Sequence, residues 1–119
     1  MDQWDIISQS FIKSELNKEA PGFRILSEKI QTLSDKEKHG VWMRLGEAFR
    51  NRYWSNNSDI DKRRAVQCYI EALFNRPDAT MVVAWDGLEL LGAKSSSTER
   101  SRDTIQLLRM QYGSITQEG

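Results

Sequence analysis

The side chains that could act as a nucleophile, a base or a soft metal ligand are few, because the chain holds one His, His39, and one Cys, Cys68. A structural zinc site takes about four ligands, and the sequence offers no further thiolate or imidazole beyond these two. His39 lies early in a predicted helix and is interpreted as a solvated or capping side chain. Cys68 adjoins Tyr69 on an apolar helix face, which favours a small buried residue. We therefore expect no catalytic residue, no metal site and no cofactor.

The carboxylates and glycines do not form a catalytic pattern either. Asp59 and Asp61 flank a predicted helix start, where unpaired N–H groups and the helix dipole favour negative charge. The glycines in the chain are isolated from one another and none stands in a strand-to-helix turn, so no phosphate-binding loop is indicated. The sequence predicts a protein that is not an enzyme.

Basic and aromatic residues interleave over residues 50–64. The members of this basic–aromatic cluster are Arg50, Arg52, Tyr53, Trp54, Lys62, Arg63 and Arg64. Such a cluster can stack bases and neutralise phosphates, which makes a nucleic-acid-binding regulator one alternative function. The carboxylates that lie close by in sequence and can pair with these cations on adjacent helical turns are Glu47, Asp59, Asp61 and Glu71. A solvated, ion-paired face is therefore the preferred interpretation, and nucleic acid is an unlikely partner.

Composition places the chain among single soluble globular domains. It has 119 residues, of which 39% are hydrophobic, and its 17 Lys and Arg balance its 17 Asp and Glu. The zero net charge argues against a partner that is recognised through charge alone. The longest apolar run, residues 81–85, is far shorter than the roughly 20 residues that cross a bilayer, so no membrane partner is expected. The acidic N-terminus lacks an apolar signal core, and we expect a cytoplasmic protein.

The elements that must position these side chains are helices, because apolar residues recur at intervals of three and four along almost the whole chain. The pattern predicts helices at about residues 3–18, 25–33, 34–55, 58–75, 78–91 and 98–112. The predicted start signals are Ser34 with Glu37, which have capping-box spacing, Ser58 with Asp61, and Asp78. No strand alternation persists. We expect one helical domain over residues 1–113 and a flexible tail over residues 114–119.

The stretch 42–77 resembles a tetratricopeptide repeat. The matching signature residues are Trp42, Leu45, Gly46, Phe49, Ala65, Tyr69, Ala72 and Pro77. From Phe49 to Ala65 the chain is about seven residues longer than the 34-residue repeat allows. Gly46 and Ala65 are small where two antiparallel helices would touch, and Pro77 would end the second helix.

The same stretch is also similar to a Sel1-like repeat, which has a longer loop between its helices. The resemblance rests on residues 45–49 and on Asp61, Ala65, Tyr69 and Ala72, with Arg64 in place of the usual Lys and Asn56-Asn57 in place of a Gly-rich loop. The choice between the two families stays open. Either resemblance implies an all-α fold of about six helices stacked as antiparallel hairpins in a short α-solenoid.

Both families bind other proteins through a groove lined by the first helix of each hairpin. With Trp42, Leu45, Gly46 and Phe49 turned into the hairpin, the predicted partner-binding row is Met43, Glu47, Arg50, Asn51 and Trp54. Trp54 either folds back onto Ile60 or stays exposed as an anchor. The resemblance therefore implies a small adaptor or chaperone that binds a helix or short segment of another protein. A small inhibitor or immunity-type protein is a further alternative to the nucleic-acid-binding regulator.

Overall fold

The computed structural model describes residues 30–75, 82–95 and 99–113, and within these ranges it contains helices and no strand. The helices are α3 (Asp35–Asn56), α4 (Asp59–Asn75), α5 (Val82–Leu90) and α6 (Arg102–Tyr112). The predicted all-α class is confirmed. The described residues hold four helices where the sequence predicted about six for the chain. The helix predicted at 3–18, most of the one at 25–33, Pro77, Asp78 and the tail 114–119 lie outside the described residues.

Helix α3 begins where the sequence predicted, directly after Ser34. The Ser34 hydroxyl accepts a hydrogen bond from the Glu37 backbone N–H at 3.3 Å, as an N-cap should. The second half of the expected capping box differs, because the Glu37 carboxylate accepts from the Ser34 hydroxyl at 2.9 Å. One orphan N–H is therefore satisfied by the predicted side-chain pair.

Helices α3 and α4 are joined by a tight turn. Asn57 adopts a left-handed conformation with φ 58°, and its N–H donates to the Tyr53 carbonyl at 2.7 Å. The Ser58 N–H donates to the Asn56 side-chain oxygen at 2.9 Å, and the Ser58 hydroxyl accepts from the Asp61 N–H at 3.5 Å. The two polar Asn residues thus end α3, and Ser58 begins α4 as predicted.

The predicted end of α5 is confirmed, whereas the predicted start of α6 is wrong. Gly92, at φ 74°, ends α5 as predicted, and the following Ala93 N–H donates to the Leu88 carbonyl at 2.9 Å. Helix α6 begins at Arg102 and not near residue 98, because Ser101 is extended and its hydroxyl accepts from the Thr104 N–H at 3.3 Å. The N-cap therefore defines a shorter helix than the apolar spacing suggested.

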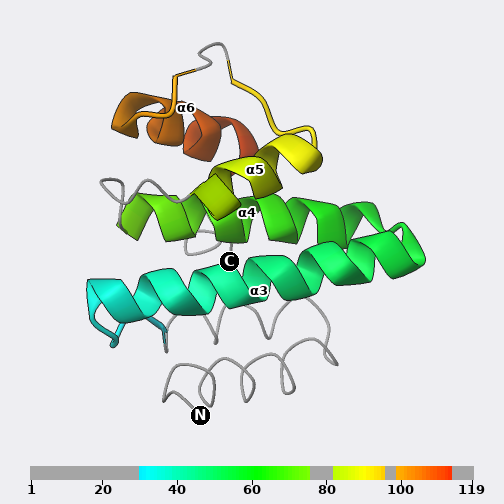
Figure 1. Cartoon of the computed structure of the whole chain (residues 1–119), viewed down its shortest axis with the longest axis horizontal. Helices are drawn as coiled ribbons and strands as arrows, with labels where there is room; N and C mark the ends of the chain where they lie inside the picture. The colour runs from blue at the N-terminus through cyan, green and yellow to red at the C-terminus, as the bar shows by residue number, and fades with distance from the viewer. Residues whose placement is uncertain (1–29, 76–81, 96–98, 114–119) are drawn as a thin grey trace.

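Helix α4 is the centre of the described structure. It runs antiparallel to α3 and lies between α3 on one side and α5 and α6 on the other (Figure 1). The largest fully buried side chains include Trp42, Leu45, Tyr69, Ile70 and Leu73. Helices α3 and α4 form the expected antiparallel hairpin, whereas α5 and α6 each pack mainly on α4. None of the helices described is long and apolar enough to cross a membrane.

Candidate functional site

The predicted partner-binding row is only partly on the surface. Met43 is 7% exposed and belongs to the core, so it does not offer the surface contact that was expected of it. Glu47 and Arg50 are half-buried, and Asn51 is exposed. Trp54, at the end of α3, is 58% exposed. The structure therefore leaves a surface at the end of α3 made by Arg50, Asn51 and Trp54, with Glu47 at its edge.

Trp54 stacks with a neighbour on its own helix. The guanidinium carbon of Arg50 lies 4.9 Å from the centre of the Trp54 ring, at cation–π distance. Ile60 is 68% exposed and does not bury the indole. The exposed alternative for Trp54 is the one that the structure shows, and the stacked guanidinium restricts the side chain before any partner binds.

The other cations of the basic–aromatic cluster have intramolecular partners. Arg52 Nε lies 3.3 Å from Asp61 Oδ2, and Asp61 is buried. Lys62 Nζ lies 5.7 Å from the centre of the Tyr53 ring. Arg64 donates to the Gln67 side-chain oxygen at 3.0 Å. The cluster is a network of internal contacts, in which Arg52 with Asp61 is an ion pair and the other two are a cation–π contact and a hydrogen bond to an amide.

Tyr69 of α4 is fully buried between α3 and α5. A Cβ atom placed on Gly46 of α3 would lie 3.0 Å from Tyr69 Cε1, and one placed on Gly87 of α5 would lie 2.8 Å from Cε2 and Cζ. The ring therefore fills the space that the two glycines leave. Burial raises the pKa of Tyr69 from 10.0 to about 12, an effect opposed by Arg50 and reinforced by Glu47. Its buried hydroxyl has no hydrogen-bond partner among the described residues.

His39 and Cys68 both lie in the packed interior of the described residues. His39 is 6% exposed, so it is not solvated, and its Nδ1 donates to the Ala72 carbonyl in the last turn of α4 at 2.7 Å. It caps α4 and not its own helix. Cys68 is fully buried, and burial raises the pKa of its thiol well above the usual 9.0. The described residues contain no group of three His, Cys, Asp or Glu side chains placed to hold a metal ion.

Helix α6 is fastened to α4 by polar side chains. Arg109 Nε lies 3.0 Å from Glu71 Oε1, and Glu71 is 3% exposed. Gln67 is fully buried, and its amide donates to the Tyr112 carbonyl at the end of α6 at 2.9 Å. These pairs join residues 38 and 45 positions apart, and no local sequence signal marks them.

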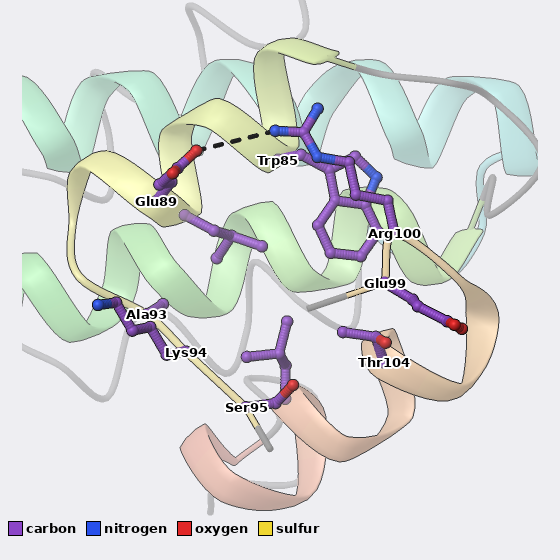
Figure 2. A pocket seen from close by; sticks show the side chains of 10 residues that line it. Trp85, Glu89, Ala93, Lys94, Ser95, Glu99, Arg100 and Thr104 are labelled. Carbon is purple, nitrogen blue, oxygen red and sulfur yellow. Dashed lines mark ion pairs between the residues drawn. The ribbon is translucent and has the colours of Figure 1, made fainter. Parts of the chain in front are cut away.

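Between α5 and the residues leading into α6 lies a pocket of about 410 Å³ (Figure 2). Its lining residues are Trp85, Leu88, Glu89, Ala93, Lys94, Ser95, Glu99, Arg100, Thr104 and Leu108. The sequence pattern did not predict this pocket. The apolar spacing of α5 and α6 gives no sign of it, because spacing within a helix does not specify how two helices lie relative to one another.

Comparisons with known proteins add no further indication: no family model, no curated protein and no solved structure matches the chain.

Proposed function

We propose that the chain is a non-enzymatic protein-interaction module, a small adaptor or chaperone that holds a helix or short segment of another protein. The observation that supports this proposal is the exposed Trp54 with Arg50 stacked on it at the end of α3. Tryptophan and arginine are the residues most enriched where binding energy concentrates in protein interfaces. A Trp side chain already restricted by its neighbour loses less conformational freedom on binding.

The proposal keeps the tetratricopeptide-like or Sel1-like interpretation of residues 42–77, with the chain as a short solenoid in the cytoplasm. The α3–α4 hairpin is compatible with one repeat, since Gly46 and Tyr69 meet where the repeat pattern requires a small residue and an aromatic ring to meet. The proposed contact surface is Glu47, Arg50, Asn51 and Trp54. Arg50 supplies donors for a carboxylate or carbonyl group, and Trp54 supplies an apolar anchor.

The test compares matched variants of the full chain. A partner is first captured from a lysate of the source cells and identified, and its affinity is then measured for the wild type, Arg50→Ala, Trp54→Ala and Met110→Ala. Met110 is 81% exposed on α6 and serves as the control for removing an exposed apolar side chain. Arg50→Ala and Trp54→Ala should each weaken binding by at least about 1 kcal/mol, with the unfolding midpoint nearly unchanged. Met110→Ala should bind like the wild type.

An unchanged affinity in the Arg50→Ala/Trp54→Ala double variant would place the contact elsewhere, on the α5–α6 side of the molecule. A salt titration of the wild type separates the alternative of nucleic-acid binding. Affinity for a nucleic acid falls steeply with salt because counterions are released from phosphates, whereas a contact made by an aromatic anchor changes little.

A further inference from the structure

The pocket between α5 and α6 contains a binding site for a cation, called here the seat, and an arginine of the same chain occupies it. The guanidinium carbon of Arg100 lies 6.0 Å from the centre of the Trp85 ring. One of its nitrogens, Nη2, lies 3.0 Å from Asp86 Oδ1 and 3.8 Å from Glu89 Oε2. Figure 2 shows Arg100 over Trp85 with its ion pair to Glu89. An aromatic face flanked by two carboxylates is a suitable receptor for a guanidinium or ammonium group.

Arg100 can leave this seat without disturbing the helices that form it. The side chains of Arg100, Asp86 and Glu89 are 45%, 52% and 76% exposed, and ion pairs this exposed to water contribute little to stability. Trp85, Asp86 and Glu89 all belong to α5, whereas Arg100 precedes α6. Helix α5 remains anchored by its own packing on α4, so the empty seat would keep its shape.

The rest of the pocket indicates what else would fit. Its volume of about 410 Å³ exceeds what one guanidinium group needs, and part of its lining is apolar, from Leu88, Ala93 and Leu108. A long side chain with an alkyl stem and a cationic end matches this lining. With Arg100 displaced, the carboxylates around the pocket outnumber the one remaining cation, that of Lys94, which favours a positively charged occupant.

We propose that this pocket binds an arginine or lysine side chain of a partner peptide, and that Arg100 occupies the seat as an internal competitor. The site is separate from the surface at the end of α3 and does not depend on the function proposed for that surface. Because Arg100 must leave before a partner binds, the measured affinity is reduced by the fraction of molecules in which the seat is filled.

The experiment uses N-acetyl-arginine methylamide as the probe and N-acetyl-citrulline methylamide as its neutral counterpart. The full chain is titrated as wild type, Arg100→Gln and Arg102→Gln, and the indole N–H resonance of Trp85 reports binding. Arg102 is exposed and lies outside the pocket, so its replacement removes the same charge without emptying the seat. Arg100→Gln should bind the arginine probe at least about threefold more tightly than either other protein. The citrulline probe should not shift the resonance.

Equal affinity in Arg100→Gln and the wild type would overturn the proposal, as would equal binding of the citrulline probe or no binding at all. Guanidinium chloride is titrated alongside, and if it binds as well as the blocked arginine, the assignment to a peptide side chain is wrong. An Asp86→Asn/Glu89→Gln variant gives a second test that does not depend on Arg100. Both side chains are exposed, so the variant should fold, and it should lose binding of the arginine probe.

Discussion

Two kinds of contact hold α4 to its neighbours, and they differ in what they depend on. Toward α3 and α5, the Tyr69 ring occupies the space left by Gly46 and Gly87, so the contact depends on volume. Toward α6, buried Glu71 pairs with Arg109 at 3.0 Å beside the apolar packing of Ile105 and Leu108, so the contact depends partly on charge. One helix is thus held by shape on one side and by a buried ion pair on another. The two contacts should therefore fail under different substitutions.

The largest effect is expected from filling the glycine space. Gly46→Leu should lower the free energy of unfolding by about 3 kcal/mol or more. Even a Cβ atom at Gly46 would lie 3.0 Å from the Tyr69 ring, and the ring cannot move away because Gly87 lies close on its other side. Denaturant unfolding followed by circular dichroism measures this loss. In a Tyr69→Ala background the same substitution should cost clearly less, since the ring it displaces is gone. An unchanged denaturant midpoint in Gly46→Leu would show that the contact does not depend on volume.

The next effect tests the charged contact. Arg109→Leu should lower the free energy of unfolding by about 2 kcal/mol or more, because it leaves the Glu71 carboxylate, 3% exposed, without this cation. Glu71→Met combined with Arg109→Leu should recover most of the loss, since the buried carboxylate of Glu71 is then removed together with its cation. Thermal unfolding of the single and double variants decides the matter. If the double variant is no better than Arg109→Leu, volume and not charge governs the α4–α6 contact.

The two contacts of α4 also differ in how far the sequence could predict them. The repeat-like spacing identified Gly46 as a small residue of a helix crossing and Tyr69 as a signature aromatic residue, because shape matching between neighbouring helices requires small and aromatic residues at fixed intervals. The pairing of Glu71 with Arg109 leaves no such trace, because any of the chain's arginines could have served. Gly87 was missed for a related reason. Its role depends on where α5 crosses α4, which the spacing within α5 does not specify.

Some features of the candidate site could likewise be predicted from the sequence and others could not. Exposure of Trp54 was predictable as one of two alternatives, since it lies beyond the usual end of the first repeat helix. The burial of Met43 was not, because helical periodicity places a residue on a face without saying what covers that face. The pocket around Trp85 was also out of reach, since Asp86 and Arg100 are 14 residues apart and meet only through tertiary packing.

The smallest effect concerns alkaline pH. Because the pKa of Tyr69 is raised to about 12 when folded, the unfolded chain loses this proton first as pH rises above 10.0, and stability falls. The Tyr69→Phe variant has no such proton. Tyr69→Phe should therefore become more stable relative to the wild type as the pH rises, by on the order of 2 kcal/mol in the free energy of unfolding by about pH 12. Urea unfolding at a series of pH values measures it.

Below about pH 9 Tyr69 keeps its proton in both the folded and the unfolded chain, so comparing Tyr69→Phe with the wild type there shows the effect of the hydroxyl without titration. The Tyr69 hydroxyl has no hydrogen-bond partner among the described residues, so replacing it by hydrogen should change stability by less than about 1 kcal/mol. A larger loss at neutral pH would mean that the hydroxyl itself, and not only the ring, holds α3 and α5 to α4. A pH-independent difference would contradict the raised pKa.

His39 gives the α3–α4 hairpin a second closure. The turn at Asn57 connects the helices at one end, and at the other His39 Nδ1 holds the Ala72 carbonyl at 2.7 Å. Helix ends ordinarily fray one turn at a time, and the backbone amides near them exchange their protons with solvent at little energetic expense. A hairpin with hydrogen bonds between its helices at both ends is expected to fray less in this way. We therefore expect its amides to exchange when both helices open together, with the hairpin as a single cooperative unit of unfolding.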